Sequence, residues 1–233
     1  MVKVKLKLDW ANYKAAEYSC KNWHYSKCLP IGKSVKVGVW ENNKFIGVVL
    51  FSRGTAPTLG KKYGLVQTEC VELTRIALTN HISPVSRIMA IALKFLQKSN
   101  KGIRLVVSFA AKSENHHGGI YQACNWIYTG ETTANKDAIY KGRRVPNRSL
   151  TPISQRYKCT VSELIKKGVF SDIRQIGKHR YLMPLDEEIK KRTIILSKPY
   201  PKRVKQATVN DQLTGRGGRT HPHAPNIMDV RNG

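Results

Sequence analysis

The chain has 233 residues, of which 41 are Lys or Arg and 15 are Asp or Glu, and its formal net charge is +26. A hydrophobic content of 41% is enough for a folded core, which excludes a fully disordered chain. No apolar run approaches the roughly 20 residues of a membrane-spanning helix, and the N-terminal alternation of Lys with Val and Leu is unlike a secretion signal. We therefore expect a cytoplasmic protein with no membrane partner. The five cysteines form no Cys-x-x-Cys pair, so neither a disulfide framework nor a zinc knuckle is indicated.

The excess of positive charge is spread over the whole chain. Residues 1–140 carry 20 basic and 8 acidic groups, and residues 141–233 carry 21 and 7. A polyanionic partner would relieve the self-repulsion of such a body. Nucleic acid is the first candidate, because neutralised phosphates release counterions and so drive binding. The alternative is a basic protein that is merely soluble.

The first third of the chain predicts a helix and a hairpin after an initial strand. Val and Leu alternate with Lys over residues 2–8, which is typical of a half-buried strand. Asp9 is placed to cap a helix over 11–22. Strands are expected at 34–40 and 45–51, with a tight turn at Asn42-Asn43 and a bulge at Gly47.

The middle of the chain predicts a strand–helix–strand unit. The strand at 69–78 precedes Ser83 and Pro84, read as an N-cap followed by proline at the first position of a helix to Gln97. A strand at 103–109 follows. The remaining expected elements are a short helix at 118–125, a strand at 126–131, a hairpin at 138–145 and a helix at 160–168 capped by Thr160 and Glu163. Together they predict a mixed α/β sheet with an antiparallel front and a central βαβ unit.

Three segments carry residues suited to chemistry, and each has a plain structural alternative. The turn at 79–87 leads into a helix N-terminus, which suits a phosphate, although an ordinary capped helix explains it too. The segment His116-His117-Gly118-Gly119 with Tyr121 follows a strand, where ligand sites are common, but it also fits an exposed loop.

The third segment is Trp23-His24-Tyr25. It could stack an extruded base and move a proton, or its aromatic rings could close the core, which is the better interpretation for Trp23. Arg75, inside a strand, could pair with a ligand anion or with Glu72.

Several blocks closely resemble the phage Mom family: CKNWHYSKCLP at 20–30, ELTRIAL at 72–78, VSFA at 107–110, HHGGIYQACNWIYTG at 116–130 and GKHRYLMPL at 177–185. The similarity runs over most of residues 15–185. The resemblance implies a DNA-modifying transferase in the host cytoplasm that places a carbamoylmethyl group on adenine N6 and protects phage DNA from restriction. It also implies a GCN5-like N-acetyltransferase fold, with helices on both faces of the sheet, and acetyl-coenzyme A as donor.

The resemblance further implies where the donor would bind. In this fold an opening between two central strands, here 69–78 and 103–110, receives the pantetheine arm, and the next helix N-terminus meets the diphosphate. Tyr121 takes the place of the tyrosine that protonates the departing thiolate. The implied donor-binding residues are Ile76, Ala77, Leu78, Ser83, Ser86, Arg87 and Tyr121.

One position departs from the family pattern. An aspartate is expected after the Ser-Phe-Ala block, and this chain has Ala111. An aspartate there could act as a base or hold a metal, and alanine can do neither. We therefore hypothesise that Ala111 makes this chain an inactive variant. Iron, suggested for the family, would have only His24, His116 and His117 as candidate ligands.

For the nucleic-acid side, we expect double-stranded DNA with a flipped adenine, stacked by Tyr25 or Trp23 and positioned by His24 and Arg75. The expected DNA-binding residues are Trp23, Tyr25, Arg143, Arg144, Arg148, Lys202, Arg203 and Lys205. The predicted organisation is a catalytic core at 1–150, an extension packed on it at 151–198 and a basic, partly disordered arm at 199–233. Two alternatives stay open: a plain N-acetyltransferase of a protein or RNA amine, and a DNA-binding module with a vestigial pocket.

Overall fold

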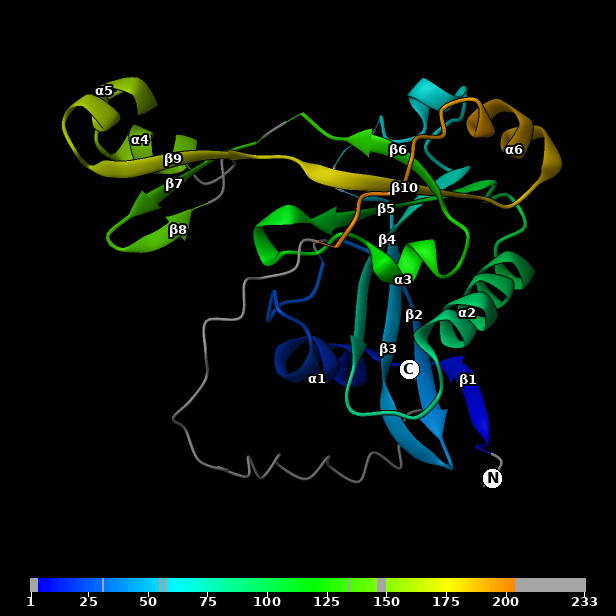
Figure 1. The fold of residues 1–233 in the computed structure, drawn as a ribbon. Coiled ribbons are helices and arrows are strands. Elements are labelled where there is room, and N and C mark those ends of the chain that lie inside the picture. Colours follow the sequence, from blue (N-terminus) through cyan, green and yellow to red (C-terminus); the bar gives the residue numbers. More distant parts are fainter. Residues whose placement is uncertain are drawn as a thin grey trace.

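The computed structural model describes residues 4–30, 32–54, 56, 58–133, 135–145 and 150–203. They form a seven-stranded sheet with the order β1-β2-β3-β4-β5-β10-β6 and a three-stranded sheet with the order β8-β7-β9 (Figure 1). In chain order the elements are β1 (Leu6–Trp10), α1 (Tyr13–Trp23), β2 (Ser34–Glu41), β3 (Lys44–Ser52), η1 (Lys61–Tyr63), β4 (Cys70–Leu78), α2 (Val85–Ser99), β5 (Leu105–Ala111), η2 (Lys112–Glu114), α3 (Gly119–Gln122), β6 (Ile127–Glu131), β7 (Asn135–Tyr140), β8 (Arg143–Val145), α4 (Leu150–Arg156), α5 (Val161–Lys166), β9 (Phe170–Ile176), β10 (Lys178–Pro184) and α6 (Glu187–Ile194).

The predicted architecture of the sheet is confirmed. Neighbouring strands of the large sheet pair antiparallel except for β4 and β5, which are parallel and joined through α2 as a βαβ unit. Ile88, Met89 and Leu96 of α2 pack into the largest core cluster on one face of the sheet. Ala15, Ala16 and Cys20 of α1 pack against β3 and β4 in a separate cluster. Helices therefore cover both faces.

The β2–β3 hairpin forms as its sequence predicts. Asn42 and Asn43 both have positive φ, 49° and 64°, which is the geometry of a two-residue hairpin turn. The register shifts where Val39 pairs with Gly47 and Trp40 with Phe45, so the predicted bulge at Gly47 is confirmed. A Cβ on Gly47 would lie 2.0 Å from the Ala77 carbonyl oxygen, so the close approach of β4 requires glycine.

Two helix caps differ from the prediction. Asp9 lies in β1, and the N-cap of α1 is Asn12, whose side chain accepts a hydrogen bond from the Ala15 amide. The N-cap of α2 is Pro84, not Ser83, and it has no capping side chain of its own. The predicted capping box of Thr160 and Glu163 is confirmed at α5.

The segment expected as an extension on the core instead contributes a strand to the main sheet. β10 pairs with β5 along its whole length, from Lys178 opposite Ala111 to Pro184 opposite Leu105, and it also pairs with β6. β6 is therefore separated from β5 by a strand that lies about 50 residues later in the chain.

Residues 135–176 form a separate lobe, which contains β7, β8, β9, α4 and α5 and stands away from the main sheet in Figure 1. It has a small core of its own around Ala138, Leu150, Leu164 and Phe170. The lobe follows β6 and precedes β10, so two neighbouring strands of the main sheet carry it.

Candidate functional site

The parallel strands β4 and β5 pair only at their start. Their ladder joins Cys70–Glu72 to Leu105–Val107, and beyond it the strands separate. A cavity of about 700 Å³ occupies the opening, and we call it the inter-strand cavity. Its lining residues are Trp23, His24, Tyr25, Thr74, Arg75, Ile76, Phe109, Ala110, Asn115, His116, His117, Gly118, Gly119, Ile120, Tyr121 and Arg203.

Ser108 stands at the point where the ladder ends. Its hydroxyl lies 2.8 Å from the Leu73 carbonyl oxygen and 2.8 Å from the Tyr121 hydroxyl, and all of the Ser108 side chain is buried. A serine hydroxyl has one proton. When Ser108 donates that proton to Leu73, the Tyr121 phenol donates to Ser108. The opening of the sheet and the orientation of Tyr121 thus depend on one side chain.

Tyr121 is held as a neutral phenol. Burial raises its pKa to about 12, against the lowering effect of the Ser108 hydrogen bond. Its ring packs against the rings of Trp126 and Tyr181 at centroid distances of 5.1 and 5.0 Å. A buried, protonated phenol can serve as an acid for a strongly basic leaving group, and this is the role that the resemblance implies for Tyr121.

His24 is neutral and has a defined tautomer. Burial, and then the charges of Arg75, His116 and Lys27, lower its pKa to about 4. Its Nδ1 accepts the Ser26 backbone N–H at 3.1 Å and lies 2.7 Å from the Ser26 hydroxyl. Because Nδ1 is an acceptor, Nε2 carries the ring proton. His24 therefore acts as a hydrogen-bond donor at neutral pH and cannot take up a proton at Nε2 in this tautomer.

Tyr25 and His116 lie beside His24. The rings of His24 and Tyr25 are 4.3 Å apart at a tilt of 34°, and His116 meets the edge of Tyr25 at 5.3 Å. Half of Tyr25 is exposed (50%). An aromatic surface that is fixed by two imidazoles and partly open suits the stacking of a planar base.

Arg75 and Trp23 have structural duties as well as a place in the cavity wall. Arg75 donates from Nη1 to the Thr74 carbonyl at 2.7 Å and approaches the Cys28 carbonyl at 3.5 Å, which ties β4 to the segment after α1. Trp23 packs edge-on against Tyr18 at 5.2 Å and against Phe45 at 6.1 Å. As the sequence favoured, Trp23 is a core side chain.

The loop before α3 is shaped by Tyr181 of β10. The Tyr181 hydroxyl donates to the His117 carbonyl at 2.5 Å, and Gln122 donates to the same oxygen at 3.0 Å. Gly118 has φ +80°, and a Cβ there would lie 2.3–2.6 Å from the Tyr181 ring. This position therefore requires glycine both for its backbone conformation and for the contact.

The last described residues lead the chain to the cavity. Lys198 donates its amide to the Tyr128 carbonyl at 2.8 Å, and Tyr200 donates its hydroxyl to the Trp126 carbonyl at 2.8 Å. The Pro201 carbonyl accepts from Gln122 at 3.2 Å, and Arg203 then lines the cavity. The beginning of the expected basic arm thus lies against the core.

The structure brings His24, Tyr25, Arg75, Tyr121, Ile76, Trp23 and Arg203 to one cavity. Ala77 and Leu78 do not line it: Ala77 packs toward α1, and Leu78 packs into the largest core cluster. Ala111 ends β5 one residue beyond the lining residue Ala110 and is itself buried outside the lining. Arg143 lies in the lobe and Lys202 is exposed, both outside the lining. The side chain of Arg144, and Arg148 and Lys205 as a whole, lie outside the described residues.

The loop before α2 does not fit the diphosphate of coenzyme A. Ser83 is buried, and its amide and that of Ile82 already donate to the carboxylate of Glu41. Pro84 follows and has no N–H. Ser86 and Arg87 line a different cavity, of about 360 Å³, between α2 and the end of α3. By contrast, the edge of β4 beyond Glu72 is not paired with β5 and so fits the linear, amide-bearing pantetheine arm.

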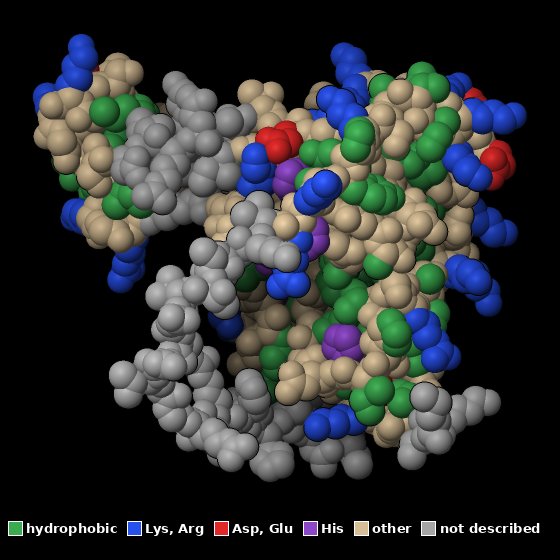
Figure 2. Space-filling view, in the orientation of Figure 1, with side chains coloured by type: hydrophobic (Ala, Val, Ile, Leu, Met, Phe, Trp, Pro, Cys, Tyr) green, Lys and Arg blue, Asp and Glu red, His purple; other side chains and the backbone are tan. Residues whose placement is uncertain are grey.

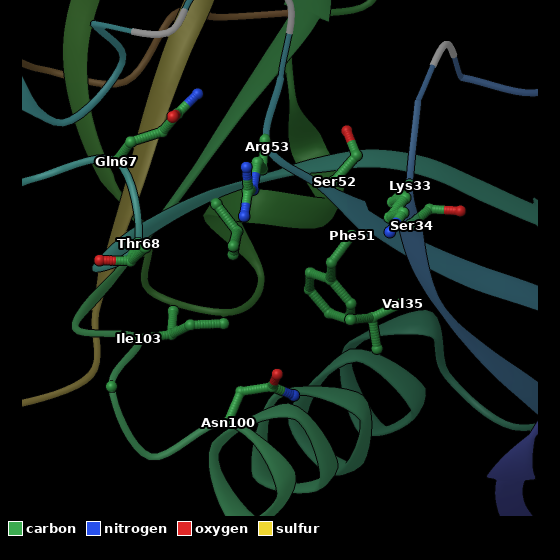
Figure 3. Close-up of a pocket in the computed structure, with 12 residues that line it drawn as sticks. Lys33, Ser34, Val35, Phe51, Ser52, Arg53, Gln67, Thr68, Asn100 and Ile103 are labelled. Atoms are coloured by element: carbon green, nitrogen blue, oxygen red, sulfur yellow. The ribbon is translucent and has the colours of Figure 1, made fainter.

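A second cavity, of about 390 Å³, lies at the other end of the strands (Figure 3). Figure 3 shows Arg53, Phe51, Ile103 and Asn100 around it. No His, Asp or Glu is among its described lining residues, so it lacks the acid–base groups of the inter-strand cavity. The inter-strand cavity is therefore the candidate active site.

No three His, Cys, Asp or Glu side chains are grouped to hold a metal ion among residues that the structure describes. The iron that the resemblance implied thus has no grouped ligand set in this part of the chain. In the same part, no helix is both long and apolar enough to cross a membrane.

The sequence profile of the Mom protein family matches residues 5–202. The chain belongs to the Mom protein family. No curated protein sequence matches it. Among solved structures, a proposed acetyltransferase from Acinetobacter baylyi ADP1 has a TM-score of 0.45 at 9% identity and covers 80% of this chain and 95% of its own. A proposed phosphinothricin N-acetyltransferase has a TM-score of 0.45 at 12% identity, with coverage of 78% and 100%.

Three contributors to the site were missed by sequence reasoning. Ser108 orients Tyr121, Tyr181 shapes the loop before α3, and Glu41 occupies the loop before α2. A serine in the middle of the apolar run LVVSFAA was a signal for the first. Tyr181 and Glu41 act on residues more than 40 positions away, and no local pattern marks them.

Proposed function

We propose that this Mom-family protein is a DNA-modifying transferase that adds a carbamoylmethyl group to adenine N6, with acetyl-coenzyme A as the source of the two-carbon unit. The observation that carries the proposal is the inter-strand cavity, which is lined by the proton-bearing His24 and the open ring of Tyr25 together with the buried acid Tyr121. Such a modification would protect phage DNA from host restriction enzymes.

The cavity offers what an extruded adenine needs. Adenine inside a duplex hides its N6, so the base must leave the stack to reach a cavity of this kind. Tyr25 provides an aromatic surface for it, and the Nε2–H of His24 suits the acceptor nitrogens of the adenine ring. Arg75 holds the segment that carries both side chains against β4.

Tyr121 acts on the donor side. Coenzyme A, when bound, supplies a thioester that activates the two-carbon unit. The phenol of Tyr121 keeps its proton at neutral pH because burial raises its pKa to about 12. It can therefore deliver a proton to a developing thiolate, and Ser108 aligns the phenol for this step.

Mass spectrometry of nucleosides from DNA that has been coexpressed with the chain tests the proposal. We expect carbamoylmethylated adenine with the unaltered chain, loss with Tyr121→Phe, and no loss with Tyr63→Phe, a matched buried tyrosine outside the inter-strand cavity. Acetylated protein or RNA in place of modified adenine would refute the proposal and favour a plain N-acetyltransferase.

Ala111→Asp tests the separate hypothesis that the chain as written is inactive. If Ala111 abolishes activity, modified adenine appears only with the A111D variant. Modification by the unaltered chain would refute this hypothesis and leave the proposed reaction intact.

The basic lobe supports DNA as the partner. Residues 135–176 contain ten Lys or Arg and three Asp or Glu. The described basic side chains that are exposed there are Lys141, Arg143, Arg156, Lys158, Lys166 and Lys167. Figure 2 shows the lobe set apart from the main body by a hollow, with Lys and Arg side chains on both parts. We propose that the lobe binds phosphates of the duplex whose base enters the inter-strand cavity.

Salt dependence of DNA binding tests the role of the lobe. The slope of log K against log salt falls by about 0.9 for each phosphate contact that is lost. We expect Lys166→Gln with Lys167→Gln to reduce the slope by one to two such steps. Lys190→Gln with Lys191→Gln, on α6 at the opposite side of the molecule in Figure 1, serves as the matched control and should leave the slope unchanged. Equal effects of the two pairs would refute the assignment.

A further inference from the structure

We infer that this protein binds its donor by the acyl-pantetheine arm alone, and that Glu41 occupies the place in which an acetyltransferase would hold the diphosphate of coenzyme A. The inference rests on the proposed function and deepens it by naming the donor class. That class is acyl-pantetheine thioesters, whether the arm belongs to coenzyme A or to a pantetheine-bearing carrier protein.

Glu41 is built into the loop that precedes α2. It is the last residue of β2, and its side chain is only 7% exposed. Its Oε2 accepts the Ile82 N–H at 2.8 Å, and its Oε1 accepts the Ser83 N–H at 2.7 Å. Burial alone would raise the pKa of this carboxyl, but the hydrogen bonds from Ser83 and Ile82 hold it below its ordinary value. Glu41 is therefore an anion at neutral pH.

A carboxylate in this position excludes a diphosphate for two reasons. Phosphates bind at helix N-termini through free backbone N–H groups, and the two amides before Pro84 are already used by Glu41. The negative charge of Glu41 also satisfies the positive end of the α2 dipole and would repel a second anion beside it.

The inter-strand cavity does not share this obstacle. The β4 edge beyond Glu72 is unpaired with β5, so its backbone groups are available to the amides of a pantetheine arm. Tyr121 lies in the lining of the same cavity. The arm and the thioester are thus provided for, whereas the nucleotide end of coenzyme A is not.

One rival anchor exists in the described part of the chain. Arg87 lines the separate cavity between α2 and α3, and a guanidinium there could bind a phosphate in place of the loop amides. This rival predicts a strong preference for coenzyme A over the bare arm, so the same binding experiment decides between the two.

The experiment compares acetyl-coenzyme A with acetyl-pantetheine by calorimetry on the unaltered full chain, at about 0.3 M salt so that non-specific attraction to the basic surface is screened. We expect the two dissociation constants to agree within about threefold. A preference for acetyl-coenzyme A above about 30-fold, the size of a charge-assisted anchor, would overturn the inference and leave the proposed function standing. Binding of neither thioester would overturn both the inference and the proposed donor.

Glu41→Gln provides the second measurement. Removing the charge and one acceptor exposes a loop amide, so we expect acetyl-coenzyme A to bind about tenfold more tightly, with acetyl-pantetheine unchanged. The matched control is Glu69→Gln, since Glu69 also accepts a loop amide, that of Val66 at 2.9 Å, but away from α2. An unchanged ratio of the two constants in a folded E41Q protein would overturn the inference. An acetylated carrier protein, tested beside free acetyl-pantetheine, distinguishes the two sources of the arm.

Discussion

The Tyr121–Ser108–Leu73 hydrogen-bond chain makes a quantitative prediction. Ser108→Ala leaves two buried groups without their partner, the Tyr121 phenol and the Leu73 carbonyl. An unsatisfied buried polar group costs about 1–3 kcal/mol. We therefore expect Ser108→Ala to lower the free energy of unfolding by about 2–4 kcal/mol, which corresponds to about 2–4 °C in Tm for each kcal/mol in a protein of this size.

A double-mutant cycle isolates the phenol. In a Tyr121→Phe background the phenol is absent, so Ser108→Ala affects only the Leu73 carbonyl and should cost about 1–2 kcal/mol. The measurement is chemical denaturation of the four proteins. Ser154→Ala is the control, because Ser154 is also buried and its hydroxyl donates to a single carbonyl, that of Thr151 at 2.8 Å. An equal cost of Ser108→Ala in both backgrounds would show that the phenol does not depend on Ser108.

Three further predictions concern local structure and titration. Gly118→Ala should destabilise the protein by about 2–4 kcal/mol through overlap with Tyr181, whereas Gly168→Ala, with a positive φ but open space, should cost only about 1 kcal/mol in denaturation experiments. Asn12→Ala should cost about 1 kcal/mol through loss of the α1 N-cap, and no measurable loss would contradict the capping role. Because the folded pKa of His24 is about 4, below its unfolded value, stability should fall as pH decreases from about 6.5 to 4. NMR titration of His24 near its ordinary pKa would contradict that reasoning.

The sequence predicted the elements and the residues whose signals are local. The Asn42-Asn43 turn and the bulge at Gly47 follow from backbone conformations that few other residues adopt. His24, Tyr25 and Tyr121 were singled out by their type and by family resemblance, and the separation of β4 from β5 brings them to one cavity. Their protonation states could not be predicted, since these depend on burial and on neighbours such as Arg75.

Long-range pairings account for what the sequence did not predict. Nothing within KHRYLMP indicates that this strand inserts between β5 and β6, because its position is decided by partners more than 40 residues earlier in the chain. Ser83 fits a local N-cap pattern, yet Glu41, 42 residues away, occupies the amides of that loop. A carboxylate can satisfy two amides at once and is favoured at a helix N-terminus, so it prevails over a serine hydroxyl.

Parting two parallel strands creates a cavity at a cost, because backbone groups that a ladder would have paired must find other partners. At the end of the β4–β5 ladder the Leu73 carbonyl is satisfied by Ser108, and the same hydroxyl orients Tyr121. Further along β4 the edge facing β5 stays open, which is where an amide-bearing arm can complete the pairing. The residue that stabilises the opening therefore also positions the acid, so a mutation of Ser108 should change stability and transfer activity together, whereas Tyr121→Phe should abolish transfer at a smaller cost in stability.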